Sequence, residues 1–171
     1  MSNLIKEKAI IFSTKMIQAI LEGRKTQTRR IFKEHYGIPS PPDLEKINKY
    51  SKYKTQDILY VKETYDLDYD GGNELIAFYK ADYSLDELEN MNKIIKWKNP
   101  LYMPKKYSRI KLKIKGLGVQ QLQDISESDV LKEGVESIKN YSMLWDSIHN
   151  KKDSLKWKDN PWVFVYDFEK I

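Results

Sequence analysis

The 171-residue sequence contains no cysteine. This absence excludes disulfide bonds, thiolate metal sites and a cysteine nucleophile. The two histidines, His35 and His149, lie far apart and lack the spacing of metal ligands, so we expect no metal and no other cofactor. No apolar run approaches the roughly 18 residues of a membrane span, and the first residues lack the apolar core and cleavage site of a signal peptide. We therefore expect a cytoplasmic protein with no membrane partner.

Arginine is scarce, whereas lysine is abundant. Only four of the 30 basic residues are arginines, and three of these, Arg24, Arg29 and Arg30, fall within seven residues. The guanidinium group offers a planar fork of donors that lysine lacks. A sequence that uses arginine rarely and then clusters it indicates a site where that fork contacts a phosphate or a base.

The net charge of +5 is the small remainder of large blocks of opposite sign. Residues 24–54 carry a net charge of +6, residues 57–89 carry −8 and residues 90–115 carry +9. The last block also contains aromatic residues, and this mixture is typical of surfaces that bind a phosphate backbone with bases stacked beside it. A solvated strand face with an exposed loop explains the same pattern equally well.

Hydrophobic periodicity predicts more strands than helices. Strands are expected over 9–13, 57–65, 74–80, 109–114, 119–122 and 161–168. Helices are expected from Ser13 or Thr14 to Gly23, over 124–134 with Ser126 as the N-cap, and over 142–149. Strands and helices do not alternate, which disfavours a doubly wound parallel sheet. The pattern favours a mainly β, α+β fold, namely a small antiparallel β-barrel with two or three short helices.

Three segments carry a family resemblance: ILEGRKTQTRR at 20–30, QDILYVKE at 56–63 and LQDISESDVLKEGV at 122–135. In this order they resemble the ASCH family of the PUA-like superfamily. The ending NPWVFVY at 160–166 is similar to the closing strand of the larger, phage-borne members. The resemblance implies a single PUA-like β-barrel domain over residues 1–171, with insertions near 33–54 and 66–106, that binds RNA or a modified base.

The same resemblance implies a catalytic site. Small ASCH amidohydrolases that deacetylate N4-acetylcytidine use a lysine, a threonine three residues later and a glutamate on a later helix. These positions match Lys25, Thr28 and Glu133. In that scheme the threonine is the nucleophile, a desolvated lysine is its base and the glutamate protonates the leaving amine. Arg29 departs from the pattern, because a small enzyme of this type has an apolar residue there.

Further residues are candidates for contact with a substrate or a nucleic acid. The arginine cluster and the aromatic, basic segment supply most of them: Arg24, Arg29, Arg30, Glu63, Tyr102, Lys105, Lys106, Tyr107 and Arg109. Glu63 lies on a predicted strand, and an ion pair with one of the clustered arginines is an alternative interpretation of it.

Together these observations predict recognition of RNA, DNA or a modified nucleoside, with hydrolysis of an acyl amide on a base such as N4-acetylcytidine. Two alternatives stay open, a non-catalytic RNA- or DNA-binding module and a ribonuclease that works without a metal. Because the sequence has no cysteine and no metal-ligand pattern, we expect any catalysis to rest on the lysine, threonine and carboxylate groups that the resemblance implies.

Overall fold

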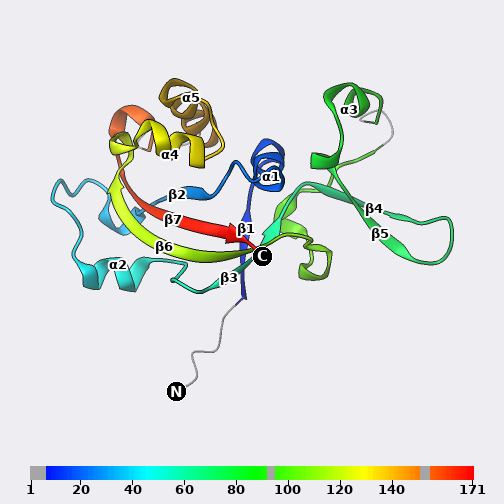
Figure 1. Cartoon of the computed structure of the whole chain (residues 1–171), viewed down its shortest axis with the longest axis horizontal. Coiled ribbons are helices and arrows are strands. Elements are labelled where there is room, and N and C mark those ends of the chain that lie inside the picture. The colour runs from blue at the N-terminus through cyan, green and yellow to red at the C-terminus, as the bar shows by residue number, and fades with distance from the viewer. Residues whose placement is uncertain (1–6, 92–94, 151–154) are drawn as a thin grey trace, which may run out of the picture.

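A five-stranded sheet organises the chain, of which the computed structural model describes residues 7–91, 95–150 and 155–171 (Figure 1). Its strands in spatial order are β1 (Glu7–Ile11), β3 (Ile58–Lys62), β6 (Lys111–Gln121), β7 (Trp162–Lys170) and β2 (Gln27–Ile31). β1 and β3 run parallel, and the other neighbouring strands are antiparallel. A separate antiparallel pair consists of β4 (Tyr65–Tyr69) and β5 (Leu75–Tyr79).

Five α-helices accompany the strands in the described residues: α1 (Thr14–Leu21), α2 (Leu44–Tyr50), α3 (Leu85–Met91), α4 (Glu127–Lys132) and α5 (Ile138–Ile148). Short 3-10 turns lie at Lys33–His35, Lys80–Asp82, Pro100–Tyr102, Lys105–Tyr107, Leu122–Asp124 and Trp157–Asp159. The predicted α+β class is confirmed. None of the helices in the described ranges has the length and apolar character needed to cross a bilayer.

The five-stranded sheet is open along one seam. β1 and β2 are its two edges, and no ladder of hydrogen bonds joins them in the part of the chain that the structure describes. A side chain spans the gap, since Arg30 of β2 donates from Nη2 to the carbonyl oxygen of Ile11 in β1 at 3.0 Å. The closed barrel expected from the sequence is therefore not seen, because β1 pairs with β3 and leaves β2 with β7 as its neighbour.

Alternate residues of β7 enter two different cores. Phe164 and Tyr166 join the cluster that also contains residues of α1, whereas Val163 and Val165 pack with residues of α4 and α5. Figure 1 shows α4 and α5 above the curved strands β2, β7 and β6, with α2 below them. Both faces of the sheet are therefore covered, and a residue of β2 faces one core or the other according to its place in the alternation.

The two regions that the resemblance predicts to be insertions carry helices that periodicity did not predict. Residues 33–54 contain α2, whose N-cap Asp43 accepts a hydrogen bond from the Lys46 amide at 2.8 Å. Residues 66–106 contain α3, preceded by a capping box in which Ser84 and Glu87 exchange hydrogen bonds. Both caps are recognisable sequence signals for a helix start.

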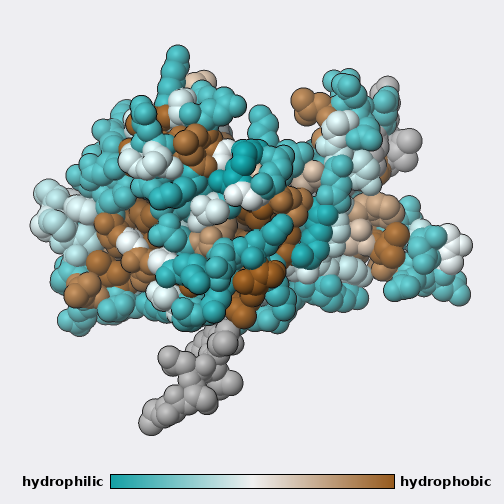
Figure 2. All heavy atoms as spheres, viewed as in Figure 1, coloured by the Kyte–Doolittle hydropathy of each residue, from teal (hydrophilic) through white to brown (hydrophobic). Residues whose placement is uncertain are grey.

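The segment from β4 to α3 projects from one end of the molecule, at the right of Figure 1. The face drawn in Figure 2 is mostly hydrophilic, and an apolar patch lies over the β4–β5 hairpin. Tyr69 and Leu75 are among the exposed apolar residues of that hairpin. The hairpin is therefore an appendage to the sheet rather than part of its core.

Two predicted strands have different limits in the structure. The expected strand over 57–65 is two strands, β3 and β4, which belong to different sheets. The expected strands over 109–114 and 119–122 are one long strand, β6, with an irregularity between Ile114 and Gly116. Alternation alone does not reveal either difference, because it reports burial and not the identity of the neighbouring strand.

Candidate functional site

A buried lysine begins the site. Lys25 follows α1 and forms a backbone bridge with Glu133, which follows α4. Its ammonium nitrogen Nζ donates to the Glu133 carboxylate oxygen Oε2 at 2.6 Å, and to the carbonyl oxygens of Glu133 and Gln27 at 2.9 Å each. The Lys25 side chain has no exposed surface, and that of Glu133 is 3% exposed. Three acceptors match the three protons of an ammonium group.

Glycine at position 134 permits this close approach. Gly134 has φ +80°, and a Cβ there would lie 2.8 Å from the Ala19 Cβ and 3.2 Å from the Lys25 Cβ. A side chain at this position would therefore incur the energetic cost of a left-handed backbone conformation. It would also clash with two neighbouring side chains. The glycine predicted to end the second helix thus also lets the end of α4 pack against Lys25 and α1.

Arg29 adds a second buried cation. Its Nη1 donates to Glu133 Oε1 at 3.1 Å and to Gln27 Oε1 at 2.5 Å, and its Nη2 lies 3.4 Å from Asp129 Oδ2. The Arg29 side chain has no exposed surface, and its Nε is a buried donor without a partner among the described residues. Glu133 therefore accepts hydrogen bonds from two cations, one on each carboxylate oxygen.

Gln27 and Asp129 complete this network, and sequence reasoning missed both. Gln27 Nε2 donates to Asp167 Oδ1 at 2.7 Å, which fixes the amide that in turn holds Arg29. Two signals were available in the sequence. Gln27 lies two residues from both Lys25 and Arg29, as side chains on one face of an extended segment do, and Asp129 lies one helical turn before Glu133.

Burial controls the ionisation of this cluster. Burial lowers the pKa of Lys25, the attraction of Glu133 opposes that shift, and the charges of Arg30 and Arg29 add to it. Burial also raises the pKa of Tyr141, and the negative charge of Glu133 raises it further. The neutral amine is thus more accessible to Lys25 than to an exposed lysine, and Tyr141 remains a neutral phenol.

Thr28 and Glu133 line one cavity of about 370 Å³, which we call the base cavity. Its wall also includes Arg29, Arg30 and aromatic residues: Phe12, Tyr141, Trp145 and His149. Lys25 is not part of this wall, and its Nζ lies 5.6 Å from the centroid of the Phe12 ring behind it.

Thr28 lies opposite Tyr166 in the β2–β7 ladder and is buried. In the alternation of β2 it faces away from Gln27 and Arg29. Because β2 is an edge strand, side chains from both of its faces reach the base cavity. Within the described residues the Thr28 hydroxyl has no hydrogen-bond partner. The structure thus brings Lys25 and Glu133 into direct contact and places Thr28 on the wall of the same cavity as Glu133.

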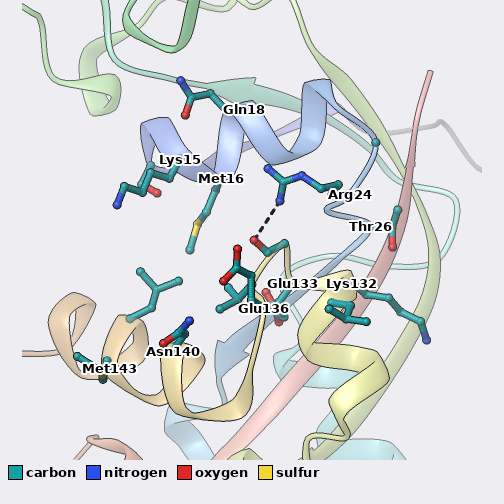
Figure 3. A pocket seen from close by; sticks show the side chains of 16 residues that line it. Lys15, Met16, Gln18, Arg24, Thr26, Lys132, Glu133, Glu136, Asn140 and Met143 are labelled. Atoms are coloured by element: carbon teal, nitrogen blue, oxygen red, sulfur yellow. Dashed lines mark hydrogen bonds between the residues drawn. The ribbon is translucent and has the colours of Figure 1, made fainter. Parts of the chain in front are cut away.

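A larger cavity of about 1000 Å³ adjoins the base cavity, and Glu133, Met16 and Ser13 border both. Figure 3 shows it between α1 and the segment from α4 to α5, with Lys15, Gln18, Arg24 and Asn140 among its labelled side chains. The dashed line in Figure 3 joins Arg24 Nη1 to the carbonyl oxygen of Gly134, 3.4 Å away. Arg24, a predicted binding residue, therefore lies in the neighbouring cavity and not in the base cavity.

The aromatic, basic segment over 90–115 contributes Pro100 to the wall of the base cavity, but none of its predicted contact residues lies there. Tyr102, Lys105, Lys106, Tyr107 and Arg109 are all absent from its wall. Tyr102 is 75% exposed, and Lys106 lies over the ring of Tyr107 with Nζ 4.8 Å from its centroid.

Most of the +9 block is neutralised by carboxylates from elsewhere in the chain. Lysines and one arginine of the block form ion pairs: Lys98 with Asp66, Lys105 and Lys111 with Glu7, Arg109 with Glu63 and Asp82, and Lys115 with Glu169. Lys93, a further member of the block, lies outside the described residues. The charge of this segment in the sequence therefore overstates its charge in the folded protein.

Glu63 pairs with Arg109 and not with the clustered arginines, so that alternative interpretation was wrong. Two hydrogen bonds of 2.9 and 3.0 Å join the Glu63 carboxylate to Arg109, and the Glu63 side chain is 1% exposed. Burial raises the pKa of Glu63, and the Arg109 guanidinium opposes this shift. In the ranges 7–91, 95–150 and 155–171, no cluster of three or more His, Asp or Glu side chains is arranged to hold a metal ion.

No protein-family model and no curated protein matches this sequence. Solved structures do match. Protein EF3133 from Enterococcus faecalis V583, of family-model DUF984, aligns with a TM-score of 0.51 at 10% identity, covering 100% of this chain and 79% of that chain. The chain shares its fold with EF3133.

Two further structures are similar at lower scores. The ASCH domain from Lactobacillus crispatus JV V101 aligns with a TM-score of 0.49 at 10% identity, covering 96% of this chain and 79% of that chain. Hypothetical protein PH0355 aligns with a TM-score of 0.47 at 14% identity, covering 97% of this chain and 100% of that chain. At these identities the likeness is one of fold.

Proposed function

We propose that this chain is an ASCH-type domain that takes an acylated nucleobase into the base cavity and hydrolyses its amide. The observation that carries the proposal is the buried hydrogen bond between Lys25 and Glu133, 2.6 Å long, beside a cavity that Thr28 also lines. The order of the motifs around Lys25, Thr28 and Glu133 supports the same assignment. The aromatic wall and the cavity volume of about 370 Å³ suit a planar heterocycle.

The short Lys25–Glu133 hydrogen bond supplies a base and an acid together. Transfer of one proton across it converts an ammonium–carboxylate pair into a neutral amine and a carboxylic acid. Burial lowers the pKa of Lys25, which favours its neutral amine form. In this form Lys25 can accept the proton of Thr28, and Glu133 can donate one to a leaving nitrogen.

The reaction then has two steps. Thr28 Oγ1 bonds to the carbonyl carbon of the amide as its proton passes to Lys25, directly or through a water. Glu133 protonates the exocyclic nitrogen as the C–N bond breaks, which releases the free base and leaves an acyl ester on Thr28. Water hydrolyses the ester and restores the hydroxyl. The unpartnered Nε of Arg29 is the donor for the negative charge that develops on the carbonyl oxygen.

N4-acetylcytidine is the direct test substrate, with release of cytidine and acetate followed by chromatography. Thr28→Ala should abolish turnover. The matched control is Thr26→Ala, because Thr26 is exposed and lines the neighbouring cavity. Wild-type protein without turnover, or turnover that survives Thr28→Ala, would reject the catalytic proposal.

A non-catalytic binding module is the second candidate, and one specific feature favours it. Glu133 is held by Arg29 as well as by Lys25, and the Lys25 ammonium already has three acceptors. Such an arrangement stabilises a static ion pair and leaves the base cavity as a recognition pocket. Calorimetric binding of N4-acetylcytidine or cytidine without product formation would support this candidate.

A further inference from the structure

The seam between the two edge strands contains a third cavity, of about 500 Å³, which we call the seam cavity. Residues 9–11 of β1 form one side of it and Arg30 and Ile31 of β2 form the other. Phe164 and Tyr166 of β7 also line it, as side chains that occupy the interior core. The cavity therefore lies where a closed barrel would have paired its first two strands.

Four cations surround the seam cavity: Arg30, Lys33, Lys52 and Lys62. Among the described residues, Glu34 is its single acidic lining residue. In the described part of the chain, none of the four cations forms an ion pair with a carboxylate. Ion pairs therefore do not offset the charge of these four cations, in contrast to the five cations over 98–115 that pair with carboxylates.

The contacts of these cations leave donors available. Arg30 uses one donor on the Ile11 carbonyl, and Lys62 donates to the Leu101 carbonyl at 2.8 Å. Lys52 lies over the Tyr53 ring, with Nζ 5.1 Å from its centroid. Burial lowers the pKa of Lys52, and the positive charges of Arg30 and Lys8 lower it further. A bound anion would relieve this repulsion.

Arg30 connects the seam cavity to the base cavity, because it lines both. Its guanidinium also lies over the Phe12 ring, 5.3 Å from the centroid, at the boundary between the two. A ligand that fills the base cavity with a heterocycle would therefore have its phosphate-bearing side beside Arg30. Arginine suits this place, since its fork can hold two phosphate oxygens.

We propose that the seam cavity binds the phosphate backbone of a nucleic-acid strand whose base enters the base cavity. This inference rests on the proposed function and names its substrate class: a base within a polynucleotide, not a free nucleoside. The four unpaired cations hold the backbone, and the aromatic wall of the base cavity receives the extruded base.

The first experiment measures binding of unmodified single-stranded RNA and DNA by fluorescence anisotropy across a salt series. Four phosphate contacts predict a slope of about −3 for the logarithm of affinity against the logarithm of salt concentration. The Lys52→Ala/Lys62→Ala variant should bind roughly 20-fold more weakly at about 0.1 M salt, with a slope about 1.4 units shallower. The nucleic acid that binds more tightly, RNA or DNA, identifies the polymer whose phosphate backbone occupies the seam cavity.

The matched control is Lys113→Ala/Lys139→Ala, which removes the same charge from lysines that lie outside the seam cavity and form no ion pair with a described residue. It should retain the wild-type affinity and slope. Equal affinity and salt slope for the wild type and the Lys52→Ala/Lys62→Ala variant, which we call the seam variant, would overturn the inference. So would a loss of binding confined to the control variant, or no binding of either strand.

The second experiment separates this inference from the proposed function. N4-acetylcytidine placed within an oligonucleotide should be hydrolysed with a higher kcat/KM than the free nucleoside, and the seam variant should lose that advantage while it retains nucleoside turnover. Equal kcat/KM for the two substrates overturns the inference and leaves the proposed function intact. If the protein binds the oligonucleotide but hydrolyses neither substrate, the catalytic proposal is overturned. The proposal that the seam cavity binds a phosphate backbone is then left intact.

Discussion

Lys25 contacts Glu133 through both the backbone and the side chain of the glutamate. Its ammonium group donates to the Glu133 carbonyl oxygen at 2.9 Å and to the carboxylate at 2.6 Å, while the two residues form an isolated β-bridge. The double contact fixes the position of the carboxylate relative to the amine. Two residues more than a hundred positions apart in the sequence are thereby joined at the C-terminal end of α4.

Loss of the Glu133 charge should destabilise the fold strongly. Glu133→Gln leaves Lys25 and Arg29 as buried cations with reduced compensation, so we expect the free energy of unfolding to fall by about 3 kcal/mol or more. Urea denaturation measures this. Glu22→Gln removes a carboxylate from the exposed pair with Arg24 and should cost less than about 1 kcal/mol. Similar losses for the two variants would contradict the prediction.

Gly134 should tolerate no side chain, whereas Gly23 should tolerate one better. Both glycines have φ near +80°, but a Cβ at Gly134 meets Ala19 at 2.8 Å and a Cβ at Gly23 meets no atom within 4 Å. Gly23→Ala should therefore cost about 1–2 kcal/mol, the penalty of the backbone conformation. Gly134→Ala should cost about 1–3 kcal/mol more because of overpacking. Thermal and urea unfolding compare the two, and equal losses would show that the close contact is unimportant.

Replacing Arg29 should raise the pKa of Lys25. The charge of Arg29 is one of the causes that lower this pKa, and its removal also leaves Glu133 free to pair with Lys25 alone. We expect the titration of the Lys25 side-chain nitrogen in Arg29→Met, followed by NMR, to move to higher pH. Arg109→Met removes a cation that pairs with Glu63 instead and should leave the titration in place. An unchanged titration in Arg29→Met would contradict the electrostatic coupling.

Glu63 should make stability depend on pH in mildly acidic solution. Burial raises its pKa above the reference value of 4.5, so the folded state holds this proton more tightly than the unfolded state. Its contribution is therefore complete below pH 4.5 and is lost as pH rises through the folded-state pKa. Glu63→Gln should flatten the corresponding fall in the free energy of unfolding, measured with urea between pH 4.5 and neutrality. An equal slope in the variant would show that Arg109 fully offsets the burial.

Local sequence signals predicted much of the secondary structure. The N-cap Ser126 accepts a hydrogen bond from Asp129, and the alternation in 161–168 matches the two cores on either side of β7. Limits between elements were less predictable. The alternation of β3 continues into β4 although the strands pair in different sheets, because period-two burial does not record which strand is adjacent.

The candidate site was only partly visible in the sequence. Lys25, Thr28 and Glu133 came from the motif resemblance, and their roles in catalysis stay predictions. Arg29 was recognised as a departure from the motif, but its bond to Glu133 joins residues 104 positions apart. Lys33 and Lys52 belong to the +6 block over 24–54, but the sequence did not distinguish them or Lys62 from the many other lysines of the chain.

The sequence by itself determined which chemistries are available. Without cysteine it excluded thiol chemistry and disulfide bonds, and it concentrated three of its four arginines between residues 24 and 30. Only the tertiary structure decided which charges remain uncompensated. It neutralised much of the +9 block with carboxylates from other elements and left the seam cations without such partners among the described residues. The physical reason is that an ion pair depends on separation in space, which strand pairing and helix packing set and the order of residues does not.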